Sequence, residues 1–366
     1  MTQNVLWWVS GALVLLAIGA VALVVAGRSP LHFDPFTGRL RRRGRPRQSV
    51  AEMLPEPQPS APRAGIVVNP TKFTDLGSLR VQIDEVCRAH GWGSPIWAET
   101  TVADPGRGQA RAAVEQGAQL VCSLGGDGTV RAVAQGLLGT TTPLALLPGG
   151  TGNLLARNLG LPIDSIEKAL VVALTGQNRR VDVGRVSIDR SGEDHRPQED
   201  IFLVMAGIGF DAAVMADAPE RLKRHVGPAA YLVSGVRNMK GPQFKVRLNV
   251  DGGPELSRRT RTVLIGNCGR LFGGVVLMPE ARVDDGLLDT IILSPKGVVG
   301  WTAVAARVLS RRRHGHSIVD HYTGARVSLR ADRPEAVQVD GDIMGAARSV
   351  SAWVEPGALV VRMPVR

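Results

Sequence analysis

The sequence predicts a transmembrane helix, then an α/β lobe built on a parallel sheet, then a β-sandwich lobe. Three observations predict this order. Residues 1–27 contain no charged side chain, residues 64–182 alternate short β-branched runs with helical stretches, and residues 183–343 are mainly strand-like runs separated by Gly- and Asp-containing turns. At 44% hydrophobic and 21% charged residues, the 366-residue chain is neither a disordered tail nor a polytopic membrane protein.

The apolar N-terminal segment is long enough to cross a bilayer. Residues 5–26 are interrupted only by Ser10, Gly11 and Gly19, and as a helix they would extend about 33 Å, which covers the hydrocarbon core. A cleaved signal peptide would carry positive charge before its apolar region, whereas residues 1–4 carry none. A buried core helix is the alternative, but a charge-free run of this length is rare in soluble cores. We therefore expect a transmembrane helix within residues 1–27.

The charge distribution predicts which side of the membrane the body occupies. The net charge is +11, and residues 28–47 hold seven Arg against one acid, Asp34. Positively charged flanks stay on the cytoplasmic side, so we expect a single-pass protein of the cell membrane whose body is cytoplasmic. Charge concentrated beside an apolar segment favours a membrane surface as partner, and not nucleic acid. Four prolines in residues 48–63 make the end of this basic linker, residues 28–63, stiff and extended.

The first lobe is predicted from alternating strand and helix patterns. Short β-branched runs predict buried strands, and apolar residues spaced three or four apart predict helices. The predicted strands are residues 65–68, 120–124 and 144–147. The predicted helices are residues 76–90, 107–116, 129–138 and 154–159. This alternation is typical of an α/β lobe with a parallel sheet.

The pattern changes to mainly strands from about residue 181. The predicted strands are residues 181–188, 201–205, 244–250, 263–266, 288–293, 327–329, 337–339 and 359–361. Helices are predicted over residues 211–217, 229–239 and 298–310. Many strands joined by Gly and Asp turns are typical of a β-sandwich.

A glycine-rich loop follows the second predicted strand. Leu124 runs directly into Gly125-Gly-Asp-Gly-Thr129, and a helical pattern comes next. Glycines allow backbone N–H groups to approach phosphate oxygens closely, and Asp127 supplies a carboxylate where Mg²⁺ would bridge those phosphates. The spacing alone is equally consistent with an ordinary tight βα loop, and the Asp within it favours the phosphate site.

Two further polar loops are predicted at the same sheet edge. Pro148-Gly-Gly-Thr-Gly-Asn153 follows the third strand and precedes a helix, and Asn69-Pro-Thr-Lys72 follows the first strand. Ligands of α/β sheets bind at the carboxyl ends of the strands, so the three loops predict a nucleotide pocket. The chain has no GxxxxGK[ST] motif and no complete GxGxxG fingerprint, which argues against a Walker ATPase and a dinucleotide oxidoreductase.

These motifs, with Asp284-Asp-Gly-Leu-Leu-Asp289 and Val339-Asp-Gly-Asp342, resemble the diacylglycerol kinase catalytic-domain family, which includes bacterial lipid kinases and sphingosine kinases. The resemblance extends from about residue 64 to the C-terminus. It implies a Rossmann-like ATP-binding lobe of the NAD kinase and diacylglycerol kinase type over residues 64–182. It further implies a β-sandwich lipid-binding lobe over residues 183–343, an active site between the lobes, and a C-terminal segment, residues 344–366, that returns to the first lobe.

The resemblance also assigns roles to individual residues. The residues implied to contact ATP are Asn69, Pro70, Thr71, Lys72, Thr100, Thr101, Gly125, Gly126, Gly128, Thr129, Thr151, Gly152 and Asn153. Asp127 is implied to lie near Mg²⁺ and the transferred phosphoryl group. A metal away from ATP would be held by Asp285 and Leu287, with a carbonyl from Arg282 and with Asp211 in the same acidic network. Residues 284–289 alone are equally explained as a plain Asp-Gly turn.

The catalytic base implied by the resemblance is Asp342, which would accept the proton of a lipid hydroxyl as it attacks the γ-phosphate. The family usually has Glu at this position, so the side chain here is one methylene shorter. Leu154 is a second departure, since many relatives have Asp there.

The resemblance implies a lipid kinase of phospholipid biosynthesis that uses ATP and Mg²⁺, with diacylglycerol converted to phosphatidic acid as the first expectation and a homodimer as a further one. The alternatives are a kinase for a sphingoid or other lipid, an NAD kinase-like enzyme, and a non-catalytic membrane-bound sensor of nucleotide or lipid. The sequence lacks an Asn-Glu dipeptide after the glycine-rich loop, which argues against NAD kinase.

Overall fold

The computed structural model describes residues 61–192, 197–209, 243–271, 276–295 and 319–365. The predicted transmembrane helix, most of the basic linker, Asp211 and the helices predicted over residues 211–217, 229–239 and 298–310 lie outside these ranges. Among the described residues, no helix is both long and apolar enough to cross a membrane.

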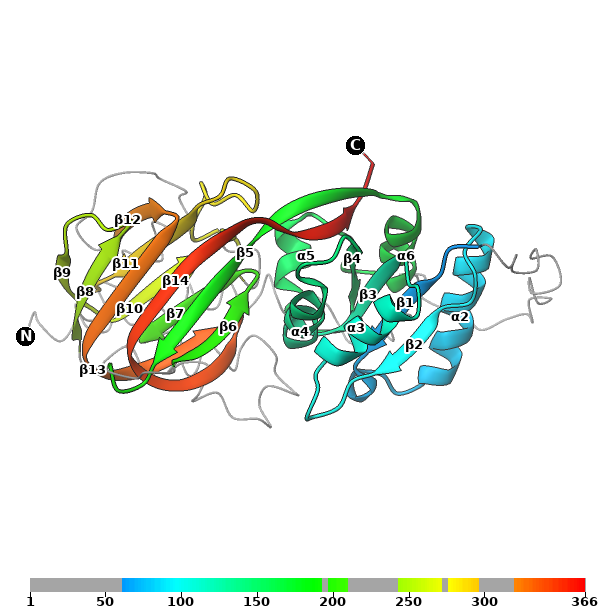
Figure 1. The fold of residues 1–366 in the computed structure, drawn as a ribbon, viewed down its shortest axis with the longest axis horizontal. Helices are drawn as coiled ribbons and strands as arrows, with labels where there is room; N and C mark the ends of the chain where they lie inside the picture. Colours follow the sequence, from blue (N-terminus) through cyan, green and yellow to red (C-terminus); the bar gives the residue numbers. More distant parts are fainter. Residues whose placement is uncertain (1–60, 193–196, 210–242, 272–275, 296–318, 366) are drawn as a thin grey trace, which may run out of the picture.

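The first lobe is a parallel sheet with the strand order β4-β3-β1-β2 (Figure 1). Its strands are β1 (Ala64–Val68), β2 (Ile96–Glu99), β3 (Leu120–Gly125) and β4 (Leu144–Pro148). Its helices are η2 (Pro70–Lys72), α2 (Leu76–Ala89), α3 (Arg107–Glu115), α4 (Asp127–Leu137), α5 (Leu154–Asn158) and α6 (Ile166–Thr175). The core on one face contains buried residues of α2 and α6, and the core on the other contains those of α3, α4 and α5.

The predicted strands and helices of this lobe agree with the structure to within about two residues, and three elements were not predicted: the short helix η2, strand β2 and helix α6. Strand β2 is short and has only Ile96 buried, so its apolar pattern is weak. Helix α6 reads Ile-Glu-Lys-Ala-Leu-Val-Val-Ala-Leu-Thr, an apolar run whose period does not distinguish helix from strand. The Ser165 side chain caps this helix by accepting the N–H of Lys168. A serine at this position is the sequence signal that distinguishes the start of a helix from a strand.

The second lobe consists of antiparallel strands, as its pattern predicts. They are β5 (Gln177–Asp189), β6 (Gln198–Phe202), β7 (Met205–Gly209), β8 (Phe244–Val250), β9 (Leu256–Thr260), β10 (Thr262–Gly266), β11 (Leu288–Leu293), β12 (Val319–Gly324), β13 (Arg326–Val339) and β14 (Asp342–Met363). The prediction of separate strands at 327–329 and 337–339 was wrong, because these are the two ends of β13. Charged and polar residues occupy its middle, where the register shifts between residues 330 and 335.

Two long strands connect the lobes. Strands β5 and β14 pair from Asp189 and Ser349 to Gln177 and Met363, and Figure 1 shows both running from the sandwich to the α/β lobe. Val361 of β14 then pairs in parallel with Leu144 of β4, so the described strands form one continuous sheet. The predicted strand at residues 359–361 is therefore only the end of a 22-residue strand.

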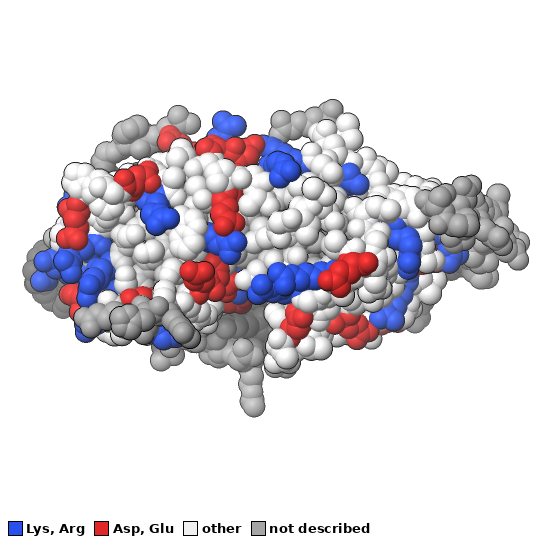
Figure 2. Space-filling model, in the orientation of Figure 1, with Lys and Arg blue, Asp and Glu red and all other residues white. Residues whose placement is uncertain are grey.

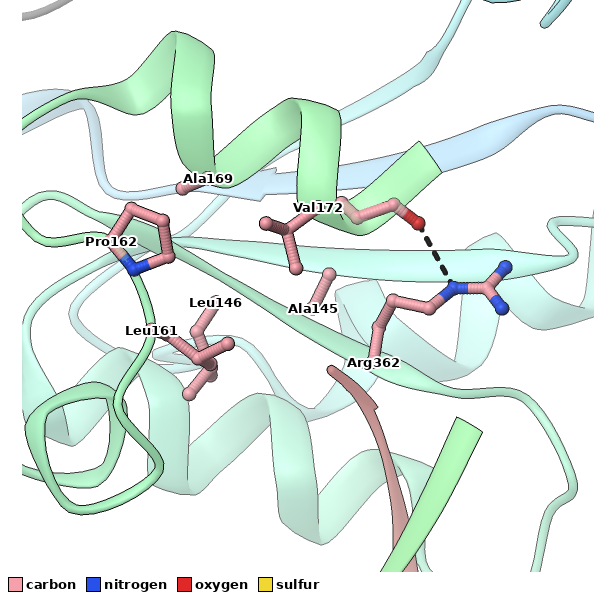
Figure 3. A pocket seen from close by; sticks show the side chains of 8 residues that line it. Ala145, Leu146, Leu161, Pro162, Ala169, Val172 and Arg362 are labelled. Atoms are coloured by element: carbon pink, nitrogen blue, oxygen red, sulfur yellow. Dashed lines mark hydrogen bonds between the residues drawn. The ribbon is translucent and has the colours of Figure 1, made fainter. Parts of the chain in front are cut away.

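Arg362 ties the end of β14 to α6. Its Nε donates to the carbonyl oxygen of Ala173 at 3.0 Å (Figure 3), and its Nη1 donates to the carbonyl oxygen of Gly176 at 3.1 Å. A cation at a helix C-terminus satisfies free carbonyls and interacts favourably with the helix dipole. The same arginine borders a narrow, mainly apolar crevice between β4 and α6. None of the residues that line this crevice is a predicted site residue.

Candidate active site

The two glycine-rich loops of the first lobe are in direct backbone contact. Gly149 N–H donates to the carbonyl oxygen of Gly125 at 3.1 Å. A Cβ atom on Gly149 would lie 2.8 Å from Gly125 Cα, and one on Gly150 would lie 2.7 Å from Gly126 Cα. Only residues without a side chain allow this approach, so the glycines bring the N-termini of α4 and α5 together.

The N-terminus of α4 presents backbone donors at this point. Gly126 is the N-cap of the helix and makes no side-chain capping bond. The N–H groups of a first helical turn have no partner within the helix, and the helix dipole makes this end attractive to anions. Gly125 and Thr129 pack closely, since a Cβ on Gly125 would lie 2.7 Å from Thr129 Cβ. The loop is thus shaped to receive an anion such as a phosphate group.

Asp127 connects the two loops. Its Oδ1 accepts the N–H of Leu154 at 2.6 Å, at the start of α5. Burial raises the pKa of this carboxyl group to about 6, and the nearby charges of Asp340 and Asp342 act in the same direction, while the bond from Leu154 opposes them. Asp127 is therefore mainly ionised at pH 7. Asp127, which is predicted to lie near Mg²⁺, also caps the neighbouring helix α5.

The other predicted nucleotide-binding loops lie at the same edge of the sheet. Asn69 N–H donates to the carbonyl oxygen of Leu124 at 3.0 Å, and Asn69 Oδ1 accepts the N–H of Thr71 at 3.1 Å, which caps η2, the short helix that contains Pro70 and Lys72. Thr100 and Thr101 follow β2, the next strand. The structure thus places these residues at the carboxyl ends of β1 and β2.

The second glycine-rich loop is stabilised by its own polar side chain. Asn153 has a left-handed backbone with φ of 47°, and its Nδ2 donates to the carbonyl oxygen of Gly150 at 2.8 Å. Thr151 is exposed and Gly152 lies beside Asp127, since a Cβ on Gly152 would lie 2.2 Å from Asp127 Oδ2. All three residues lie between β4 and α5, as predicted.

The turn between β13 and β14 faces these loops from the second lobe. Asp342 is exposed, and a Cβ on Gly128 would lie 3.1 Å from its Oδ2. The preceding carboxylate, Asp340, is buried and accepts three backbone N–H groups, those of Leu203, Val204 and Met205, at 2.9 to 3.0 Å. Burial raises the pKa of Asp340, and these bonds oppose the shift. The turn is thereby fixed with Asp342 against the first turn of α4.

Arg131 belongs to the candidate site and was not predicted from the sequence. It lies on α4 four residues after Asp127, and its Nη2 donates to Asp342 Oδ2 at 2.7 Å. Its Nη1 donates to the carbonyl oxygen of Val339. Residues four apart on a helix share a face, so the spacing from Asp127 was the available signal.

In the turn predicted to bind a metal, backbone N–H groups donate to the carboxylates of Asp285 and Asp182. Asp285 Oδ1 accepts the N–H of Leu287 at 3.1 Å, and burial raises the pKa of Asp285. Buried Asp182, also missed, accepts the N–H groups of Gly286 and Gly357, each at 2.7 Å. The side chain of Arg282 is largely exposed. Across the described ranges, no three or more His, Cys, Asp or Glu residues are grouped so that they could hold a metal ion.

Comparison with known proteins identifies the family. The family model for the diacylglycerol kinase catalytic domain matches residues 63–186, and the model for the YegS C-terminal NAD kinase beta sandwich-like domain matches residues 204–363. A "Probable lipid kinase YegS-like" of Pseudomonas aeruginosa is 34% identical over 270 residues, which cover 70% of this chain and 82% of that protein. The chain belongs to this family of lipid kinases.

Other members of the family agree in sequence and fold. The "Diacylglycerol kinase" of Bacillus subtilis is 26% identical over 288 residues, which cover 77% of this chain and 90% of that protein. The crystal structure of a diacylglycerol kinase from Bacillus anthracis has a TM-score of 0.60 at 19% identity, covering 84% of this chain and 98% of that chain. The structural likeness supports the fold, a mixed α/β lobe followed by a β-sandwich.

Proposed function

We propose that this lipid kinase transfers the γ-phosphoryl group of ATP to the hydroxyl group of diacylglycerol, which gives phosphatidic acid, with Mg²⁺ as the required metal. One observation carries the proposal. The exposed carboxylate of Asp342, from the second lobe, lies against Gly128 at the place where two helix N-termini of the first lobe converge. An anion site and a facing carboxylate are the parts that phosphoryl transfer to a hydroxyl group requires.

The nucleotide would bind along the carboxyl edge of the first sheet. The two glycine-rich loops, residues 125–129 and 149–153, would hold its phosphates through backbone N–H groups. The loops after β1 and β2, with Asn69 to Lys72 and Thr100 and Thr101, would line the rest of the nucleotide site. Every loop in this assignment lies at the same edge of the sheet.

The side chains present fit a magnesium ion. Mg²⁺ prefers carboxylate and phosphate oxygens, and the negative charges of Asp340 and Asp342 are close enough to raise the pKa of Asp127. We assign Asp127 as the group that would hold the metal, which when bound would neutralise charge on the phosphates, and Asp342 stays free to act as a base. Asp285, Leu287, Arg282 and Asp211 are proposed for a second metal away from ATP.

Asp342 would act as the general base. It would take the proton of the lipid hydroxyl as that oxygen forms its bond to the γ-phosphorus, while the bond to the β-phosphate oxygen breaks and ADP leaves. Because its Oδ2 already approaches Gly128, the shorter Asp reaches the glycine-rich loop without the extra methylene of Glu.

The chain would act as a single-pass protein of the cell membrane, with residues 5–26 as the anchor and the body in the cytoplasm. A tethered enzyme meets a substrate confined to the bilayer at high effective concentration. Figure 2 shows acidic and basic side chains interspersed over one face of the body, in contrast to the seven arginines of residues 28–47. The basic linker would therefore lie against the anionic cytoplasmic surface.

The decisive test measures transfer of labelled phosphate from ATP to three acceptors in parallel: diacylglycerol, a sphingoid base and NAD. We expect labelled phosphatidic acid, and a loss of about 100-fold or more in Asp342→Asn with an unchanged unfolding temperature. Asp332→Asn, which changes an exposed acid elsewhere on β13, is the matched control and should keep full activity. Equal labelling by wild type and Asp342→Asn would contradict the assignment of the base.

Labelling of the sphingoid base alone would show that the protein is a lipid kinase with a substrate other than diacylglycerol. Labelling of NAD alone would contradict the proposed acceptor. Tight ATP binding without transfer to any acceptor would indicate a sensor.

A further inference from the structure

Arg131 bridges the two lobes at the proposed base. From α4 its guanidinium group reaches the β13–β14 turn with two nitrogens, one on Asp342 Oδ2 at 2.7 Å and one on the carbonyl oxygen of Val339. The Arg131 side chain is 13% exposed and that of Asp342 is 54% exposed. A planar guanidinium group fixes the direction of both bonds, so the buried Arg131 side chain determines the position of the exposed Asp342 side chain.

The charges around Asp342 favour this contact. Asp127 is the first residue of α4, and the charges of Asp340 and Asp342 act on it. Asp340 precedes Asp342 by two residues and interacts with the charge of Arg131. Repulsion between these carboxylates would turn the exposed Asp342 towards solvent. The cation of Arg131 opposes this repulsion and, from the nucleotide side, attracts the Asp342 carboxylate towards Gly128.

We propose that Arg131 is a positioning residue that holds the carboxylate of Asp342 over the glycine-rich loop, in the direction from which it accepts the proton of the lipid hydroxyl. The inference rests on the proposed function, in which Asp342 is the base. It also explains how a side chain one methylene shorter than Glu is kept in place. The two bonds require an arginine, since the single ammonium group of Lys cannot hold the Val339 carbonyl and the Asp342 carboxylate in the same geometry.

The experiment is a double-mutant cycle on turnover with diacylglycerol and ATP. Arg131→Met should lower kcat about 10- to 100-fold, because a misplacement of about 1 Å at a reacting group has effects of this size. Since the proposed action is on the base, the KM for ATP should change by less than about 3-fold. Arg131→Lys should recover part of the loss. In the Asp342→Asn background, Arg131→Met should change kcat less than about 2-fold, because the group it positions is gone.

Arg190→Met is the matched control. Arg190 Nη2 donates to the carbonyl oxygen of Met344 at 3.0 Å, two residues beyond Asp342, and to Gln198 Oε1 at 3.0 Å. Arg190 follows β5, and its replacement removes a guanidinium group that contacts β14 without removing the contact to Asp342. We expect kcat within about 2-fold of wild type, which separates positioning of Asp342 from general support of β14.

Three results would overturn the inference. They are wild-type kcat in Arg131→Met, an equal fold-loss in the wild-type and Asp342→Asn backgrounds, and a rise in the KM for ATP with kcat unchanged. If Arg131→Met fails to fold, Arg131→Lys in both backgrounds supplies the cycle. Wild-type turnover in Asp342→Asn would contradict the proposed base and the inference together, whereas loss of turnover in Asp342→Asn with none in Arg131→Met would contradict the inference alone.

Discussion

The two sides of the candidate site are built in opposite ways. On the first lobe, the site consists mainly of backbone groups, and the contacts around the glycines at residues 149 and 150 leave no room for a Cβ atom. On the second lobe, the site consists of carboxylates, with Asp340 held by three backbone N–H groups and Asp342 presented beside it. The first side is therefore sensitive to added atoms, and the second to the loss of a charge or an acceptor.

Asp127 is the exception on the first side, since it is a carboxylate among glycines, and its replacement should have the largest effect in this series, on the pH dependence of stability. The folded protein raises its pKa from 3.8 to about 6. Between about pH 4 and pH 6 the folded state keeps a proton that the unfolded state loses, so the free energy of unfolding falls as pH rises and then levels off. The contribution is up to about 3 kcal/mol, since one pKa unit corresponds to about 1.4 kcal/mol.

This effect is measured by denaturant titration of the Mg²⁺-free protein at several pH values. In Asp127→Asn, whose amide oxygen can still accept the Leu154 N–H, the fall between pH 4 and pH 6 should be smaller by this amount. An identical pH dependence in wild type and variant would show that Asp127 titrates as an ordinary exposed carboxyl group.

Asp340→Asn should have the next largest effect, because it weakens a hydrogen-bond acceptor on the second-lobe side of the site. An amide nitrogen would face one of the three N–H donors that Asp340 now satisfies. We expect a loss of about 2–3 kcal/mol in the free energy of unfolding, measured by denaturant titration at pH 7. Asp332→Asn, on an exposed part of β13, should cost less than about 0.5 kcal/mol. Equal losses in both variants would contradict the role of Asp340 in fixing the turn.

Gly150→Ala tests the first-lobe side of the site, where the two glycine-rich loops meet. The new methyl group would lie 2.7 Å from Gly126 Cα, so the loops must separate. We expect a loss of about 1–3 kcal/mol in unfolding free energy and weaker ATP binding. Gly77→Ala, in α2, meets only Asp75 Oδ1 at 3.5 Å and should instead stabilise the protein by about 0.5 kcal/mol. Unaltered stability and ATP affinity in Gly150→Ala would mean that the loops do not depend on this contact.

Arg362→Met should have the smallest effect, because it lies away from both sides of the site. It removes bonds from β14 to the carbonyl oxygens of Ala173 and Gly176. We expect a loss of about 1 kcal/mol in unfolding free energy, with kcat unchanged. A fall in kcat larger than the fall in stability explains would show that the end of β14 influences the site.

Most elements of the first lobe could be predicted, because each has a local pattern. The predicted strand at residues 65–68 and helix at residues 76–90 match β1 and α2 to within one residue at each end. In the second lobe, the bounds predicted for β8 and β11 agree with the structure, since their buried runs are clear. Strands β9 and β12 were not predicted, because exposed and charged residues dominate them and their pairing partners stabilise them.

By itself, the sequence determined where chemistry could occur. The glycines at residues 125–128 and 149–152 and the carboxylate at residue 127 follow predicted strands of an α/β lobe, and the resemblance to a kinase family adds the carboxylate at residue 342. Only the tertiary structure decided that Asp342 faces Gly128, that Asp340 fixes the turn, and that Arg131 joins the two sides. These contacts link residues more than 130 positions apart, and their geometry depends on how β14 packs against both lobes.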